Sequence, residues 1–354
     1  MIHKSIRLSE MKWLLLPFAL IYRCVAVVRN WLFDWGVLKS KAYGVPVIVV
    51  GNITVGGTGK TPHVEYLVRS LCAKRRVAVV SRGYGRSTKG FVEVRPEADA
   101  KSVGDEPLQI KRKFTDICVA VDEVRTHAID RLLADDAADT FILDDAFQHR
   151  HVRAGLNIVL VDYNRPIFKD LMLPAGRLRE PRSGIGRANI VIVTKCPDTL
   201  TEQEQRSFTE RLRLTSGTEV FFTRFGYGQL TAIGNSPAAP DLQGRTVIVA
   251  TGIARPERLY SHLAESGAKV VNLQFPDHHF FTPADIDKIA TLYQSVKSEQ
   301  KMVVMTEKDA TRLTPELISQ FGGVPVYYLP IQVEFIGGQS RFDALVSQFC
   351  ESAS

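Results

Sequence analysis

The chain has 354 residues, of which 45% are hydrophobic and 23% are charged, a composition that is ordinary for a globular protein and long enough for two domains. Its five cysteines are odd in number, far apart and without a CxxC pair, which argues against a disulfide framework and structural zinc and favours a reducing compartment. The net charge is +7, and residues 1–42 hold seven Lys or Arg against two acidic residues. Most of the positive surplus therefore lies in this N-terminal segment.

Residues 1–42 predict an amphipathic, basic helix region. The uncharged apolar run Trp13–Tyr22 has about half of the roughly 20 residues that a membrane-spanning helix needs, and no small-x-small cleavage site follows it closely. All three tryptophans of the chain lie here, and indole favours the membrane-water boundary. We expect the helix to lie on an anionic membrane surface. The alternative is a helix that docks on the protein's own core.

The stretch Pro46–Thr61, PVIVVGNITVGGTGKT, predicts a buried strand that enters a phosphate-binding loop. Its glycines let backbone N–H groups approach phosphate oxygens, Lys60 supplies a cation, and the Thr61 hydroxyl suits Mg²⁺. Thr54 stands where the strict pattern has glycine, so the loop is a GGTGKT variant. We expect ATP and Mg²⁺ as cofactors. The predicted nucleotide-binding residues are Thr54, Val55, Gly56, Gly57, Thr58, Gly59, Lys60 and Thr61.

The chain beyond this loop alternates short apolar runs with helical stretches, which predicts a largely parallel sheet with helices on both faces. We expect an α/β nucleotide-binding domain over residues 43–225. Residues 226–244 are rich in Gly, Pro and polar side chains and predict a linker. A smaller α/β domain is expected over residues 245–354.

Two groups of polar residues follow predicted strands. Asp144 and Asp145 end the run FIL, where P-loop enzymes keep the carboxylate that holds Mg²⁺; helix capping is the alternative. The basic segment Arg165–Arg187 suits a clamp for a transferring phosphate or an anionic acceptor, or else a solvated loop. Asp105, taken alone, fits a helix N-cap.

Seven motifs occur in the order GNITVGGTGKTP, SRGYGR, GDEP, LDDAFQHR, LPAGRLREP, FPDHH and TEKD. Together they resemble the tetraacyldisaccharide 4'-kinase family of lipid A biosynthesis over nearly the whole chain. The resemblance implies transfer of the ATP γ-phosphate to the 4'-hydroxyl of a tetraacylated glucosamine disaccharide 1-phosphate. It also implies a P-loop α/β/α domain joined by a β linker to a smaller α/β domain, and a peripheral enzyme at the cytoplasmic face of the inner membrane.

The resemblance also implies roles for individual residues. Asp105 matches the family's candidate base and His278 its partner, chosen over His279 because it directly follows Asp; Lys60 joins them as a catalytic residue. Ala146 departs from the glycine that the family often has. The expected metal-binding residues are Thr61, Asp144, Asp145 and Glu180, and the expected substrate-binding residues are Gln148, His149, Arg177 and Arg179.

Two other classes of function share the phosphate-binding loop. One is a P-loop kinase of a soluble small molecule, with the N-terminal helix merely docked. The other is a membrane-associated nucleotide switch that resembles partition-type ATPases. Nucleic-acid binding is not expected, because the basic excess lies in an apolar helix without a reading motif. We expect a monomer.

Overall fold

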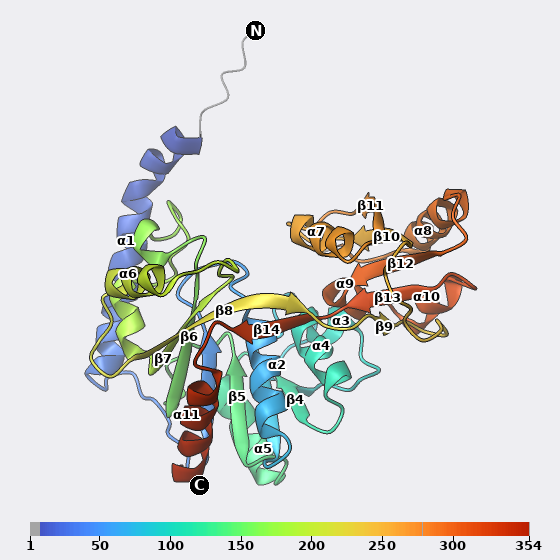
Figure 1. Ribbon diagram of the computed structural model, residues 1–354. Helices are drawn as coiled ribbons and strands as arrows, with labels where there is room; N and C mark the ends of the chain where they lie inside the picture. The colour runs from blue at the N-terminus through green and yellow to red at the C-terminus, as the bar shows by residue number, and fades with distance from the viewer. Residues whose placement is uncertain (1–7, 278, 354) are drawn as a thin grey trace.

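The computed structural model describes residues 8–277 and 279–353, and its larger sheet runs through the centre of the first lobe (Figure 1). Seven neighbouring strands from β8 to β4 are parallel, and the two edge strands are antiparallel to their neighbours. In spatial order the strands are β14 (Ile331–Phe335), β8 (Glu219–Tyr227), β7 (Ile190–Thr194), β6 (Leu156–Asp162), β1 (Val47–Gly51), β5 (Thr140–Asp144), β2 (Val77–Ser81), β4 (Cys118–Val121) and β3 (Val92–Glu93).

Helices cover both faces of this sheet, so its central strands are continuous apolar runs, as expected for a parallel sheet buried on both sides. One apolar core packs α2 (Lys60–Leu71), α4 (Asp105–Lys113) and α11 (Gln339–Ser352) against the sheet. The opposite core packs α1 (Leu8–Asp34), α5 (Arg125–Ala134) and α6 (Glu202–Leu212). The short helices of this lobe are α3 (Ala100–Val103), η1 (Ile167–Lys169) and η2 (Arg182–Arg187). The predicted α/β fold with a mostly parallel sheet is confirmed.

The second lobe is a smaller sheet with helices on both faces. Its spatial order is β11 (Lys269–Gln274), β10 (Thr246–Thr251), β12 (Lys301–Thr306), β13 (Val326–Leu329) and β9 (Thr231–Ala232), the last strand being antiparallel. Apolar side chains of α8 (Pro283–Ser295) and α10 (Pro315–Gln320) fill one face, and those of α7 (Glu257–Glu265) fill the other. The short α9 (Glu307–Thr311) lies beside α4 of the first lobe.

The chain crosses between the lobes twice, as an antiparallel ribbon of β8 and β14. The sequence predicted one linker at residues 226–244 and one domain over residues 245–354. The structure differs at the C-terminal end, because β14 pairs with β8 and α11 returns to the first lobe. Phe342, Val346 and Cys350 recur every fourth residue, so they share one helix face, and all three are buried in the core around α2.

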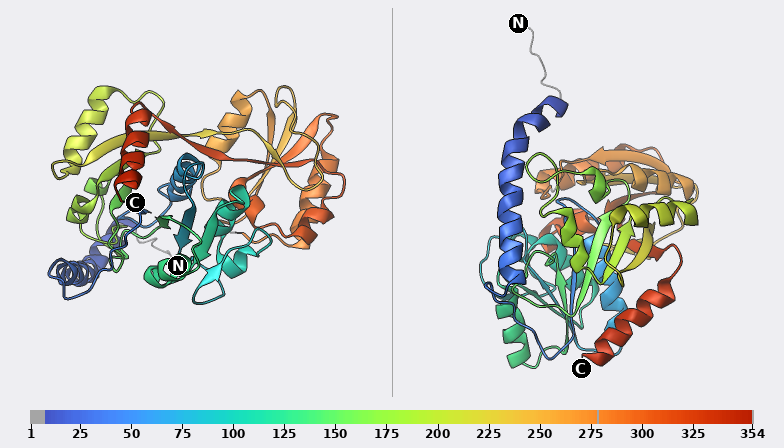
Figure 2. Two further views of the ribbon diagram at one scale, coloured as in Figure 1. Left: turned by 90° about the horizontal axis from the view of Figure 1, so that it is seen from below. Right: turned by 90° about the vertical axis from the view of Figure 1, so that its left-hand side faces the viewer.

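Helix α1 stands along one side of the first lobe, and its N-terminal part projects beyond it (Figure 2). The stretch Trp13–Asp34 is 22 residues long with a mean hydropathy of 1.4, so by length and composition it is sufficient to cross a membrane. The uncharged run ends at Tyr22, whereas the helix continues through Arg23 and Arg29 to Asp34. This apolar helix is compatible with membrane association. The exposed apolar side chains of its outer face include Trp13, Leu14, Phe18, Leu20, Ile21, Val25, Val28 and Trp31.

Candidate active site

The glycine-rich loop lies between β1 and α2, and α2 begins at Lys60. Gly59, the residue before the helix, has a φ of 88°, and a Cβ there would collide with the ring of Phe225 on β8. Only glycine combines this left-handed backbone with so close an approach. The N-terminus of α2 and the loop N–H groups together form the kind of cradle that binds phosphate.

Side chains from strand ends hold the loop in shape. The buried Asn52 donates from Nδ2 to Thr58 Oγ1 over 2.8 Å. Thr194, the last residue of β7, donates to the carbonyl oxygen of Thr58 over 2.8 Å. The ammonium group of Lys195 donates to the carbonyl of Gly57 and to Asp162 at the end of β6. These contacts hold the backbone of the loop between the ends of three strands.

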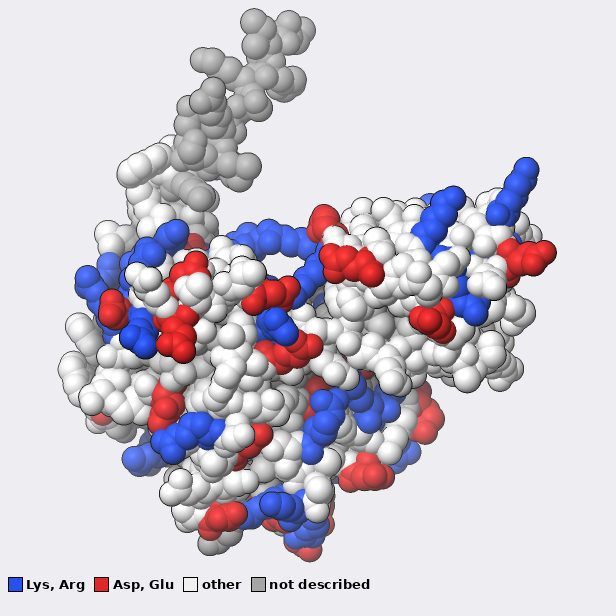
Figure 3. Space-filling view, viewed as in Figure 1, with Lys and Arg blue, Asp and Glu red and all other residues white. Residues whose placement is uncertain are grey.

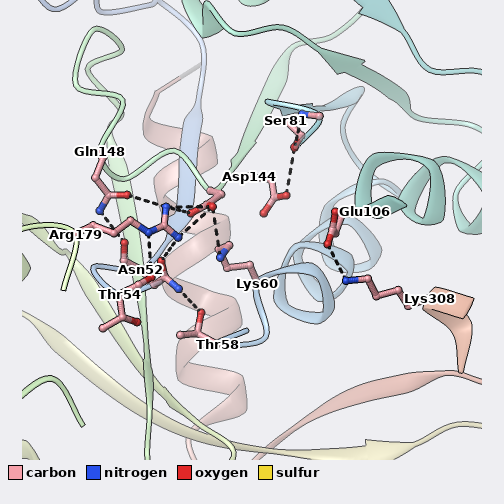
Figure 4. A network of polar contacts seen from close by, with 12 residues as sticks. Asn52, Thr54, Thr58, Lys60, Ser81, Glu106, Asp144, Gln148, Arg179 and Lys308 are labelled. Atoms are coloured by element: carbon pink, nitrogen blue, oxygen red, sulfur yellow. Dashed lines mark hydrogen bonds and ion pairs between the residues drawn. The ribbon is translucent and has the colours of Figure 1, made fainter. Parts of the chain in front are cut away.

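The segment around Arg179 lines the other side of the loop (Figure 4). Its backbone pairs with the loop, because Val55 donates to the carbonyl of Arg177 and Arg179 donates to the carbonyl of Ile53, each over 2.8 Å. The Arg179 guanidinium then donates to Thr54 O at 3.1 Å and to Asn52 Oδ1 at 2.9 Å. Arg179, which was predicted to bind substrate, therefore donates at least two hydrogen bonds to the phosphate-binding loop. The side chain of Arg177, the other predicted arginine, is exposed.

Asp144 ends β5, the strand next to β1, and Asp145 follows it, so both lie at the same edge of the sheet as the loop. Lys60 Nζ lies 3.5 Å from Asp145 Oδ2, which Arg179 also contacts. Burial, and next the charge of Asp145, raises the pKa of Asp144 to about 7. Among the described residues, Asp144 Oδ1 has no hydrogen-bond partner.

This pair fits the Mg²⁺ that the loop motif implies. A buried carboxylate oxygen without a partner needs a cation or a proton, and Mg²⁺ is held by one or two carboxylates plus substrate phosphates rather than by an all-protein cage. In the described part of the chain no group of three or more His, Cys, Asp or Glu side chains has metal-binding geometry.

We expect Asp144→Asn to stabilise the protein in the absence of Mg²⁺ and ATP. The folded-state pKa of about 7 lies above the ordinary value of 3.8, so the unfolded chain loses this proton first and ionisation destabilises the fold as pH rises from about 4 to 7. At pH 8 the free energy of unfolding of Asp144→Asn, measured by thermal unfolding, should therefore exceed that of the wild type by about 1 to 4 kcal/mol. The difference should vanish near pH 4. Equal melting temperatures for wild type and Asp144→Asn at pH 8 would contradict the burial argument. Asp116→Asn, at an exposed position, is the control.

Glu180 is buried, and its carboxylate accepts from Gln148 and Arg187, both at 2.7 Å, and from Asn30 of α1 at 3.4 Å. These donors already satisfy it, so its metal role stays a prediction. Gln148 also donates to Asn52 O at 2.8 Å. Burial and then the charge of Arg125 lower the pKa of His149 to about 4, which keeps this predicted substrate-binding side chain neutral at physiological pH.

Asp105 begins α4 where the two lobes meet. Its carboxylate Oδ2 pairs with Arg312 of the second lobe at 2.5 Å. The next residue, Glu106, acts on Asp144 through its charge, so the start of α4 lies near the two aspartates. His278 lies outside the described residues. The next residue, His279, pairs through Nε2 with Asp285 Oδ2 at 2.9 Å.

Sequence reasoning missed four residues that build this site, namely Asn52, Thr194, Lys195 and Arg312. A signal existed for three of them. Asn52 follows β1 directly, Thr194 ends β7 and Lys195 comes next, so the strand-end rule that selected Asp144 applies equally to them. Arg312 follows the helix α9 in the second lobe, and no motif connects it with Asp105.

A phosphate-binding loop closed by lysine, beside paired aspartates on the adjacent strand, defines a P-loop enzyme that acts on nucleoside triphosphates. The family model described as Tetraacyldisaccharide-1-P 4'-kinase matches residues 11–351. The chain therefore belongs to the tetraacyldisaccharide 4'-kinase family, and it is an ATP-dependent kinase.

Individual relatives agree. The chain is 43% identical to a tetraacyldisaccharide 4'-kinase of Phocaeicola vulgatus over 352 residues, covering 97% of this chain and 96% of the relative. It is 46% identical to that of Bacteroides fragilis over 340 residues, covering 93% and 90%. The crystal structure of LpxK from Aquifex aeolicus in complex with ATP aligns with a TM-score of 0.76 at 30% identity, covering 96% of this chain and 99% of that one.

Proposed function

We propose that this chain transfers the γ-phosphate of ATP to the 4'-hydroxyl of a tetraacylated glucosamine disaccharide 1-phosphate, with the residue roles given below. The observation that carries the assignment is the loop closed by Lys60, which lies 3.5 Å from Asp145 at the end of the neighbouring strand. Relatives that span more than nine-tenths of the chain bear the name of this activity.

Phosphoryl transfer depends mainly on positioning and on stabilising charge. Lys60 and the loop N–H groups bind the terminal phosphates, and Thr61, Asp144 and Asp145 would hold Mg²⁺. When bound, Mg²⁺ neutralises the charge that develops on the transferred phosphate. Arg179 orients the loop and Asp145 through the contacts already described.

The acceptor hydroxyl needs a base on the other side of the phosphate. We assign this role to Asp105, with His278 as its partner. An isolated aspartate, with a pKa of about 3.9, is a weak base for an alcohol, so a paired Asp and His held at the hydroxyl suit the step better. Figure 3 shows an opening between the lobes that has Lys and Arg side chains at its edge and Asp and Glu side chains beside them. In this proposal the cations attract an anionic acceptor.

The site works, in this proposal, at the cytoplasmic face of the inner membrane, with the protein peripheral through α1. The second half of α1 binds the site loops, since Arg29 donates to Gln148 O at 2.8 Å and Arg150 donates to Asn30 O at 3.0 Å. This half cannot enter the hydrocarbon region while it stays docked. The exposed apolar face instead suits the acyl boundary, with the basic residues among anionic head groups.

We expect the triple variant Trp13→Ser, Phe18→Ser, Ile21→Ser to lose at least about tenfold in binding to anionic vesicles, because each exposed side chain contributes about 1.5–3 kcal/mol when buried in an apolar phase. Co-sedimentation with phosphatidylglycerol vesicles measures the loss. These side chains are exposed, so ATP binding should not change, which is the control. Vesicle binding equal to that of the wild type would refute the role of α1.

The activity is tested by following labelled γ-phosphate from ATP into a purified tetraacylated disaccharide 1-phosphate in mixed micelles. Labelled lipid product is the expected result. Transfer to a soluble, unacylated sugar at the same rate would support the kinase of a soluble small molecule. Acceptor-independent hydrolysis with nucleotide-dependent dimerisation would support the nucleotide switch.

A further inference from the structure

Arg312 of the second lobe reaches across to the first lobe and holds Asp105. Its Nη2 and Nε both contact the same carboxylate oxygen, Oδ2, at 2.5 and 3.0 Å. The Arg312 side chain is 0% exposed and that of Asp105 is 11% exposed. Two charge-assisted bonds from a buried guanidinium to one carboxylate oxygen fix the position of that oxygen.

Arg312 is itself anchored within the second lobe. Its Nη1 lies 3.5 Å from Oδ1 of Asp309, a side chain that is also 0% exposed. Asp309 Oδ2 accepts from Thr251 Oγ1 at 2.8 Å, from Thr306 Oγ1 at 2.6 Å and from the backbone N–H of Gly252 at 3.1 Å. Thr251 and Thr306 end β10 and β12, so the network begins on the rigid sheet of the second lobe.

Arg312 Nη1 also donates to the carbonyl oxygen of His279 at 3.4 Å. The same guanidinium thus contacts the proposed base and the backbone of the loop that carries the adjacent histidines. One side chain joins the two segments that the proposed mechanism needs at the acceptor hydroxyl.

We propose that Arg312 is a positioning residue for phosphate transfer, and that it fixes the carboxylate of Asp105 when the second lobe contacts the first. The proposal rests on the assignment of Asp105 as the base. It implies that the Asp105 carboxylate is positioned as the base only when the two lobes are in contact. The backbone of Asp105 belongs to α4 of the first lobe, whereas the side chain that positions its carboxylate belongs to the second lobe.

Other ion pairs across the same boundary provide the comparison. Lys308 of α9 pairs with Glu106 at 3.4 Å, and both side chains are about one-third exposed. An exposed pair of this kind contributes little to stability. Lys308→Met therefore removes a cation from the same helix region and the same interface without touching Asp105.

The test measures kcat, the KM for ATP and the melting temperature of the full-length protein for wild type, Arg312→Met, Arg312→Lys and Lys308→Met. We expect Arg312→Met to lower kcat about 100-fold, the loss that a small misplacement of a reacting group produces, and to leave the KM for ATP within about twofold. Arg312→Lys keeps the charge but loses the two-donor geometry, so kcat should fall about tenfold. Lys308→Met should keep kcat within about twofold of the wild type.

A double-variant cycle separates positioning from a general structural role. Because Arg312 acts through Asp105, the pair Asp105→Ala, Arg312→Met should be no slower than Asp105→Ala alone. Added guanidinium ion should restore part of the kcat of a folded Arg312→Ala variant and none of the kcat of Asp105→Ala.

Two results would overturn the inference while the proposed function stands. One is a wild-type kcat in Arg312→Met or Arg312→Lys. The other is multiplicative losses in the double variant, which would mean that Arg312 acts independently of Asp105. If Arg312→Met does not fold, Arg312→Lys and the guanidinium experiment decide. A wild-type protein that binds ATP but transfers no phosphate to the lipid refutes the proposed function itself.

Discussion

Phosphate transfer should fall about 10²- to 10³-fold in Lys60→Ala, the loss expected when one charge-stabilising donor is removed from a preorganised site. Lys60 opens α2 at the phosphate-binding loop, and its side chain is mostly buried beside Asp145. In the proposed mechanism, its ammonium group is the cation that contacts the terminal phosphates.

The measurement is labelled phosphate transfer to the acylated disaccharide at saturating acceptor, together with ATP affinity by calorimetry. Lys297→Ala removes the same charge from an exposed position on the second lobe and is the matched control. If Lys60→Ala transfers phosphate at the wild-type rate, the loop is not the phosphate site and the assignment fails.

Asp105→Ala should lower kcat about 10²- to 10⁴-fold, the range for loss of a general base, and leave the Kd for ATP within a few-fold. The reason is its place in the fold. The phosphate-binding loop is held by Asn52, Thr194 and Lys195, and none of these contacts involves Asp105, which pairs with Arg312 at the boundary between the lobes.

Single-turnover transfer with ATP prebound separates the two effects, because binding is complete before the chemical step. Asp116→Ala, an exposed aspartate that follows the same helix, tests whether loss of any carboxylate near α4 slows the reaction. An equal loss of kcat and of ATP affinity in Asp105→Ala would remove Asp105 from the role of base.

These two predictions divide the site between ATP and acceptor. The first lobe supplies the loop and the paired aspartates for ATP. In the proposed mechanism the acceptor side needs both lobes, since Asp105 of the first lobe pairs with Arg312 of the second. Variants of the loop and of the paired aspartates should change how ATP binds and reacts. Variants of Asp105 should change turnover alone.

The sequence alone determined the features that depend on neighbours along the chain. The loop that ends in Lys60 is contiguous, so its glycines and its position between a strand and a helix identify it without the fold. Asp144 was predictable because parallel strands end at a common edge of the sheet. A residue that ends an apolar run is therefore expected at that edge, beside the loop. Seven motifs in order also indicated the family, and the family comparison confirmed it.

The tertiary structure decided every feature that depends on which surfaces pack together. Arg179 turns out to hold the phosphate-binding loop, Glu180 accepts from Gln148 and Arg187, and α11 returns to the first lobe. Arg312 is the clearest case, because it meets Asp105 only through the contact of two lobes. The sequence encodes such pairs through the shapes of whole surfaces, and no local pattern of residues carries that information.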